Sequence, residues 1–197
     1  MTTRLVLASA SPARRRLLVD AGFDPVVMVS GVDETLVEVA TCRERVAVLA
    51  ERKARAVATL APDALVVGCD SMLELGGDCL GKPADAREAR RRWQHLRGST
   101  ATLLTGHFVI DGPGGGHADG VAATVVRFGQ PSDAEIDAYV ASGEPLHVAG
   151  AFTLDGRSAP FIDGIDGDAG NVIGLSLPLL RTLLGRLGVT ITDLWRC

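Results

Sequence analysis

Hydrophobic and polar positions follow two periods along this chain, one typical of strands and one typical of helices. Short apolar runs predict strands at residues 5–7, 26–29, 64–69, 102–110 and 121–128. Apolar residues at helical spacing predict helices that begin close to Pro12, Thr41, Asp85, Ser132 and Pro178. Because strands and helices alternate, we expect a mixed α/β fold, built as one domain over residues 1–197 with two lobes.

Three of the predicted helices begin with a capping pattern, in which a small polar residue is followed three positions later by glutamate. The pairs are Thr41 with Glu44, Asp85 with Glu88, and Ser132 with Glu135. In the helix after Thr41, Lys53 lies on the same side as the apolar stripe. Lysine can bind phosphate as a point charge, which makes Lys53 and also Lys82 candidate phosphate ligands. Both could equally extend along an apolar surface to solvent.

The segment from Ser9 to Arg16 combines several features that favour anion binding. A short apolar run leads into Ser9 and Ser11, and Pro12 then fits the first position of a helix. Arg14 falls within the first helical turn, close to backbone N–H groups that no helical carbonyl accepts. Phosphate is the anion that this combination favours. A capped surface helix with solvated arginines remains the alternative.

Two acidic positions are candidates for catalysis or metal binding. Asp70 follows the apolar run 64–69, and ligand sites in open α/β sheets lie at the carboxyl ends of strands. A carboxylate in that place can bind a metal ion or activate a water molecule, although a turn aspartate is the simpler alternative. Asp33 and Glu34 are adjacent acids after another predicted strand, a pattern that suits a divalent cation but is also common on surfaces.

The remaining candidate features are weaker. The histidines show no metal-ligand spacing, so we interpret them as structural or solvated; they are His95, His107, His117 and His147. The Gly-rich segment from Asp111 to Gly120 lacks the Gly-Lys-Ser/Thr of a phosphate-binding loop. We expect it to connect two strands of a hairpin.

Composition limits the classes of partner. The formal net charge is −4 and 47% of the residues are hydrophobic, so a general nucleic-acid binder is not expected. No stretch reaches the ~20 apolar residues that a membrane span needs. The N-terminal residues lack the apolar run of a signal peptide. We therefore expect a cytoplasmic protein without nucleic-acid or membrane partners.

Short motifs along nearly the whole chain occur in the order and spacing of one known family. They are residues 7–15, Val32-Asp33-Glu34, residues 50–54, Gly68-Cys69-Asp70-Ser71, Leu80-Gly81-Lys82-Pro83, Thr105-Gly106, and residues 143–146, 149–152 and 171–178. Each motif is weak by itself, but the series is specific. With these motifs the chain resembles the Maf proteins, also called septum-formation proteins, which are nucleoside triphosphate pyrophosphatases.

This resemblance implies a fold, a reaction and roles for particular residues. The fold would be an elongated mixed sheet flanked by helices, with a cleft between two lobes, often in a homodimer. The cofactor would be a divalent cation, Mg²⁺ or Mn²⁺. By the motif match, Asp70 would be the general base or a metal ligand, and Glu34 would help to hold the metal. The triphosphate would be held by Ser9, Ser11, Arg14, Lys53 and Lys82.

The chain departs from the family pattern at positions linked to nucleobase preference. Ala13 replaces the first arginine of the family's Ser-Pro-Arg-Arg, and Asp155 stands where the dTTP/UTP branch has glutamine. In residues 97–101 another residue replaces the histidine that is common in the family after its Gly-Arg-Thr segment. The run from Pro145 to Gly150 resembles the branch associated with 7-methyl-GTP. The resemblance therefore leaves the base preference open.

Three functions follow as hypotheses. The favoured one is hydrolysis of a nucleoside triphosphate to a monophosphate and diphosphate. The second is a non-catalytic nucleotide-binding regulator of cell division or septum formation, which would bind without turnover. The third is a phosphatase that releases single orthophosphates, which no feature of the sequence favours.

Overall fold

The computed structural model describes residues 4–34, 37 and 39–196. The chain divides into two compact units. The first unit consists of Met1–Asp70, Thr105–Ala122 and Gly174–Cys197, and the second consists of Ser71–Leu104 and Ala123–Ile173. Each unit contains its own hydrophobic core.

The described strands form one seven-stranded sheet with the order β2-β1-β3-β5-β6-β7, and β4 pairs with β3 outside this path. Their bounds are β1 Leu5–Leu7, β2 Val26–Val27, β3 Leu65–Leu75, β4 Asp78–Leu80, β5 Thr100–Asp111, β6 Gly116–Phe128 and β7 Ile162–Asp166. β1 is parallel to β2 and β3, whereas the β3–β4 and β6–β7 pairs are antiparallel. The predicted mixed α/β class is therefore confirmed.

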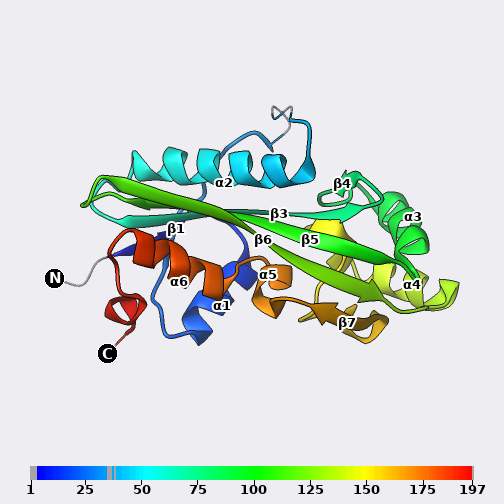
Figure 1. Cartoon of the computed structure of the whole chain (residues 1–197). Coiled ribbons are helices and arrows are strands. Elements are labelled where there is room, and N and C mark those ends of the chain that lie inside the picture. The colour runs from blue at the N-terminus through cyan, green and yellow to red at the C-terminus, as the bar shows by residue number, and fades with distance from the viewer. Residues whose placement is uncertain (1–3, 35–36, 38, 197) are drawn as a thin grey trace. The chain divides into compact units, whose positions relative to one another are not determined.

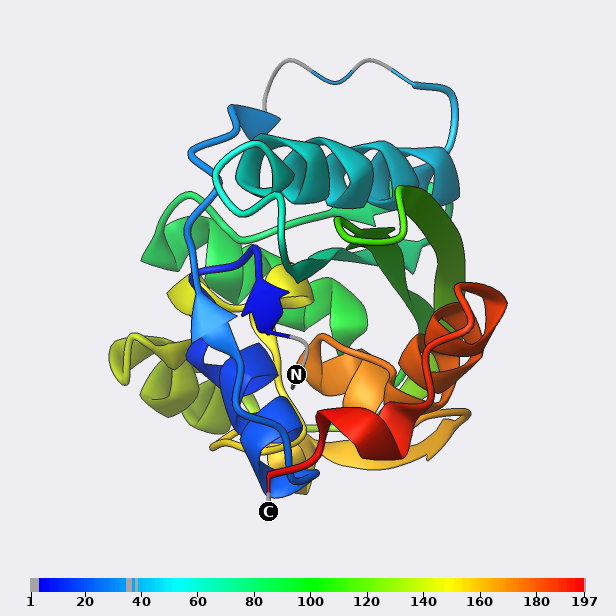
Figure 2. The same cartoon turned by 90° about the vertical axis from the view of Figure 1, so that its left-hand side faces the viewer.

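In the first unit, helices cover both faces of the sheet (Figure 1 and Figure 2). α2 (Cys42–Ala58) lies on one face, and α1 (Pro12–Asp20) and α6 (Leu177–Arg186) lie on the other. Successive strand residues point to opposite faces, so Val66 of β3 packs with Ala50 of α2, while Val67 packs with leucines of α6. The faces of this sheet therefore contribute to two separate apolar clusters.

Two glycines allow α2 to approach the sheet closely. A Cβ atom at Gly68 of β3 would overlap the carbonyl oxygen of Ala50, and one at Gly106 of β5 would overlap that of Val46. Both positions therefore require a residue without a side chain. This close contact fixes which turns of α2 face β3, and it explains in physical terms why glycine occurs in both motifs.

The second unit is built around an aromatic core. Its helices are α3 (Ala86–Leu96), α4 (Asp133–Ala141) and α5 (Ala169–Ile173). Trp93 of α3 is fully buried, and its ring meets those of Phe128, Tyr139 and Phe161 edge to face at centroid distances of 5.4–5.9 Å. The indole N–H donates to the carbonyl oxygen of Ala151 at 2.8 Å. These aromatic side chains stabilise the second unit, and none of them is a predicted site residue.

The predicted capping pattern is complete at two helices and partial at a third. Both reciprocal hydrogen bonds form between Thr41 and Glu44 at the start of α2, and between Ser132 and Glu135 at the start of α4. At α3, Asp85 accepts from the backbone N–H of Glu88, but the Glu88 carboxylate accepts from Ala84 instead of Asp85. Local sequence thus located all three helix starts.

Two strand predictions were wrong in their limits. Asp70 does not follow the end of a strand, because β3 continues through it to Leu75, where pairing with β4 extends the strand. The hairpin loop is also shorter than predicted: β5 and β6 leave only residues 112–115 between them. Gly116 and Gly120 lie in β6, where an added Cβ would come within 3.2 Å of the side chains of Leu187, the C-cap of α6, and Leu179 of α6. These glycines serve close packing and not the turn.

The described residues also bear on membrane association. Among the helices formed by residues 4–34, 37 and 39–196, none combines the length and apolar character that crossing a bilayer requires. The predicted cytoplasmic location remains a prediction.

Candidate active site

Lys53 lies between two carboxylates in the first unit. Its Nζ atom is 2.6 Å from Oδ1 of Asp70 and 2.6 Å from Oε1 of Glu34. α2 supplies the lysine and β3 supplies the aspartate, and the contact at Gly68 brings these two elements together. Lys53 and Asp70 are buried, whereas the Glu34 side chain is 53% exposed. Three of the predicted site residues therefore meet in one cluster.

Burial of the Asp70 carboxylate makes its charged form less favourable. Burial raises the pKa of Asp70 above its ordinary value, while the Lys53 ammonium and then the Arg14 guanidinium lower it. The net direction is upward, because desolvation outweighs the attraction to both cations. Oδ1 accepts from Lys53, but among the described residues Oδ2 has no hydrogen-bond partner. A buried carboxylate oxygen in this state is a candidate acceptor for a water proton or a ligand for a cation.

Ser9, Ser11 and Arg14 form a second cluster at the start of α1. Ser11 is the N-cap, and its hydroxyl accepts from the backbone N–H of Arg14. The Ser9 hydroxyl accepts from Nη1 of Arg14 at 3.0 Å and from the backbone N–H of Ser11. Nε of Arg14 donates to the carbonyl oxygen of Gly174 at 2.7 Å. The guanidinium is therefore oriented by two acceptors from different parts of the first unit.

The two clusters influence each other electrostatically. The positive charge of Arg14 acts on the ionisation of Asp70 in the same direction as that of Lys53. Both clusters belong to the first unit. The structure thus combines a helix start, two buried or half-buried cations and a buried acid, which together can hold a polyanion and orient a water molecule beside it.

Cys69 adjoins Asp70 in sequence but points to the opposite face of β3. It is buried among leucines in the cluster that includes Leu65 and Leu180. Burial raises the pKa of the Cys69 thiol to about 11. A thiol in that environment is protonated at neutral pH and unreactive, so Cys69 is a packing residue.

The remaining predicted residues stand as follows. Lys82 is exposed and follows β4 in the second unit, so its place among the phosphate ligands stays a prediction. Asp33 precedes Glu34, whose carboxylate forms an ion pair with Lys53. His95 and His117 are exposed, which agrees with the expectation of solvated side chains.

The side chains at this site determine whether it could bind a divalent cation. No group of three or more His, Cys, Asp or Glu side chains suited to a metal ion occurs within the described part of the chain. Magnesium, however, is usually bound by one or two carboxylates together with substrate phosphates and water. Glu34 and Asp70 supply two carboxylates, and Oδ2 of Asp70 accepts no hydrogen bond from the described residues. These residues therefore fit a cation that binds with a triphosphate.

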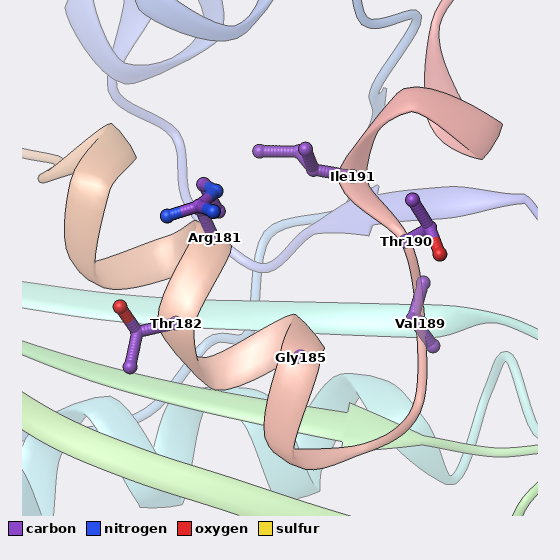
Figure 3. A pocket seen from close by; sticks show the side chains of 6 residues that line it. All are labelled: Arg181, Thr182, Gly185, Val189, Thr190 and Ile191. Atoms are coloured by element: carbon purple, nitrogen blue, oxygen red, sulfur yellow. The ribbon is translucent and has the colours of Figure 1, made fainter.

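A surface pocket of about 430 Å³ lies elsewhere in the first unit. It is formed by α6 and the segment that follows it, and it is lined by Arg181, Thr182, Gly185, Val189, Thr190 and Ile191 (Figure 3). This lining contains no carboxylate and none of the predicted site residues. It offers no chemistry for hydrolysis.

Three residues near the site have roles that the sequence alone does not reveal. Gly68 and Gly106 permit the approach of α2, and only a prediction of which helix crosses which strand could have revealed this role. His107 was interpreted as structural or solvated, and it is fully buried with hydrogen bonds at both ring nitrogens. Its burial could have been inferred from its place inside the predicted strand of residues 102–110.

Comparison with known proteins places the chain in a family. Residues 4–187 match the family model described as Maf-like protein. The chain belongs to this family. It is 65% identical over 195 residues to the nucleoside triphosphate pyrophosphatase of Streptomyces coelicolor, covering 98% of this chain and 94% of that protein. The proteins of the same name from Streptomyces avermitilis and Thermosynechococcus vestitus are 62% and 54% identical, covering 98% and 95% of this chain and 94% and 96% of those proteins.

Proposed function

We propose that this chain hydrolyses nucleoside triphosphates to a nucleoside monophosphate and diphosphate. The observation that carries the proposal is the buried Asp70 carboxylate, which is held by Lys53 through one oxygen and has no described partner for the other. The family of the chain supports this reaction type, and so does the name that the three relatives share, nucleoside triphosphate pyrophosphatase.

The residues divide into two roles in this reaction. Ser9, Ser11 and Arg14 offer a helix start and a guanidinium to the phosphate oxygens. Asp70 orients a water molecule and accepts its proton as the water oxygen attacks the α-phosphorus. The bond from the α-phosphorus to the bridging oxygen breaks, and diphosphate leaves with the electron pair. The raised pKa of Asp70 makes this carboxylate a stronger base than an exposed aspartate.

Lys53 has two proposed roles, one toward Asp70 and one toward the substrate. Its ammonium holds Asp70 in position through Oδ1 and offers positive charge to the substrate phosphates. We propose that Glu34 and Asp70 also hold Mg²⁺ or Mn²⁺ with the triphosphate. That cation would neutralise charge that develops on the phosphate oxygens. Lys82 is included among the proposed phosphate ligands on the motif match alone.

For the nucleobase, we propose that this enzyme does not use the contacts of the dTTP/UTP branch. Ala13 of α1 has no polar side chain, and the Asp155 carboxylate accepts a hydrogen bond from the Thr153 hydroxyl. Neither side chain can donate a hydrogen bond to a base when Asp155 is ionised. The proposed preference is nearer to 7-methyl-GTP, because the run from Pro145 to Gly150 resembles the branch associated with that nucleotide.

A nucleotide panel tests the proposed reaction. Purified protein is incubated with standard nucleotides, 7-methyl-GTP and other modified nucleotides in the presence of Mg²⁺ or Mn²⁺, and diphosphate and orthophosphate are measured in parallel. We expect diphosphate with at least one nucleotide, and a loss of about 100-fold or more in Asp70→Asn. Diphosphate from no nucleotide, or full activity in Asp70→Asn, would contradict the proposal.

The same panel separates the alternatives. Release of orthophosphate alone would indicate a phosphatase. Bound nucleotide that stays intact for hours with metal present would indicate a non-catalytic regulator. The homodimer remains a prediction, and light scattering coupled to size-exclusion chromatography tests it.

A further inference from the structure

His107 of β5 is a buried histidine that the proposed reaction does not use. Its side chain is 1% exposed and lies on the face of β5 that points toward α6, since Gly106 and Phe108 point toward α2. Nε2 lies 2.9 Å from the backbone nitrogen of Ser176, and Nδ1 lies 3.0 Å from the carbonyl oxygen of Thr105. Both contacts are within the first unit.

The partners of His107 determine where its proton lies. A backbone N–H can only donate, so Nε2 must accept from Ser176. A carbonyl oxygen can only accept, so Nδ1 must carry the proton and donate to Thr105. The imidazole is therefore neutral and in one tautomer. In this form it links β5 to the segment that precedes α6.

The same segment holds Arg14. Two residues before Ser176, the carbonyl oxygen of Gly174 accepts from Nε of Arg14 at 2.7 Å. Gly174 has a φ of +131°, and a Cβ atom there would come within 3.2 Å of Nε of Arg14. Ser176 is in turn the N-cap of α6. The segment from Gly174 to Ser176 thus lies between two anchors, His107 at one end and the Arg14 guanidinium at the other.

We propose that His107 is a positioning residue for substrate binding, because it fixes the Gly174–Ser176 segment whose carbonyl oxygen orients Arg14. This inference rests on the proposed function, in which Arg14 binds the triphosphate. His107 touches no substrate. Its effect passes through the Ser176 amide and the Gly174 carbonyl to the guanidinium, and it requires an acceptor at the position of Nε2.

A double-mutant cycle tests the proposal. The kcat/KM for the preferred nucleotide is measured in the wild type, His107→Leu, Arg14→Ala and the double variant. We expect His107→Leu to lower kcat/KM about 10- to 100-fold through misplacement of Arg14, mainly by raising KM. In the Arg14→Ala background the same substitution is expected to change kcat/KM less than about twofold, because no guanidinium remains to be misplaced.

Matched variants control for folding. His107→Gln keeps an acceptor near the position of Nε2, so it is expected to retain most of the activity that His107→Leu loses. Thermal melting is recorded for each protein, and His107→Phe replaces His107→Leu if the latter does not fold.

The outcomes are distinct. An equal loss from His107→Leu in both backgrounds would overturn the proposal, since a purely structural role acts whether or not Arg14 is present. Failure of both the Leu and Phe variants to fold would overturn it as well, since His107 would then be a determinant of the fold. An unchanged kcat/KM in Arg14→Ala alone would remove the proposed role of Arg14 and this inference with it. Hydrolysis through Asp70 would stand in every one of these cases.

Discussion

Trp93 of the second unit and Asp70 of the first unit are both buried, but their polar atoms differ in hydrogen bonding. In the second unit the indole N–H of Trp93 donates to Ala151 and its ring is packed by three aromatic side chains. In the first unit Asp70 is as deeply buried, yet one carboxylate oxygen has no described partner and its pKa is raised. A satisfied polar group stabilises a core, whereas an unsatisfied acid lowers stability and is retained where it has chemistry to perform. We therefore expect substitutions in the two cores to separate stability from activity.

The largest effect is expected at Asp70. Asp70→Asn should lower kcat by about 10²- to 10⁴-fold, because the amide cannot accept the proton of the attacking water. Its stability should not fall. The folded pKa lies above the unfolded value, so the ionised carboxyl costs stability as pH rises from the ordinary pKa of 3.8 through the raised one. Asn carries no such cost.

The measurement is urea unfolding of both proteins at several pH values, together with the diphosphate assay. Relative to wild type, Asp70→Asn should gain stability as pH rises from 4 toward neutral. A wild type that becomes the more stable protein as pH rises would show that Asp70 is stabilised as an anion. The contrast between the two cores would then disappear.

Trp93→Ala is expected to have the next largest effect, on stability. Removing a fully buried tryptophan should cost about 3–5 kcal/mol of unfolding free energy, through the cavity and the lost contacts with Phe128, Tyr139 and Phe161. Denaturant unfolding measures it. Trp195→Ala is the matched control, because the same side chain is removed where it is 49% exposed. Equal losses at both positions would show that the aromatic core is not specially stabilising.

Local signals in the sequence located the helices but could not establish how the site is assembled. Capping pairs and helical spacing identified α2 and α4, because their stabilising contacts lie within four residues. Helical spacing placed Lys53 on the apolar side of α2 but left open whether its side chain reaches solvent, and the structure shows that it is buried. The meeting of Lys53 with Asp70 depends on the contact between α2 and Gly68, which no periodicity encodes.

Asp70 shows where strand prediction fails. The apolar run of residues 64–69 predicts a strand that ends just before this acid. The strand instead continues through it, because Lys53 pairs with the carboxylate and β4 pairs with the residues beyond. Lys53 belongs to α2 and β4 is a separate strand, so neither pairing can be inferred from the residues next to Asp70. The motif resemblance assigned Asp70 and Lys53 to one site, and the structure brings their side chains together, but the resemblance contained no physical reason for the continuous strand.

Equivalent helix caps in the two units should behave alike. Thr41→Ala at α2 and Ser132→Ala at α4 each remove one complete capping box, and each is expected to cost about 1 kcal/mol of unfolding free energy. Denaturant unfolding of the two variants gives the comparison. A loss confined to one unit would show that the helix of the other unit is held by tertiary packing and not by its cap.

The smallest effect is expected at Cys69, one residue from the site. Cys69 points into the leucine cluster on the face of β3 opposite to Asp70, so Cys69→Ala removes a buried sulfur without touching the carboxylate. We expect a stability loss of less than about 1 kcal/mol and a kcat within about twofold of wild type. The native thiol, with a pKa of about 11, should also resist alkylation at pH 8. A large loss of kcat in Cys69→Ala with unchanged stability would mean that the two faces of β3 are not independent, and that the site depends on packing beneath it as much as on the charges above.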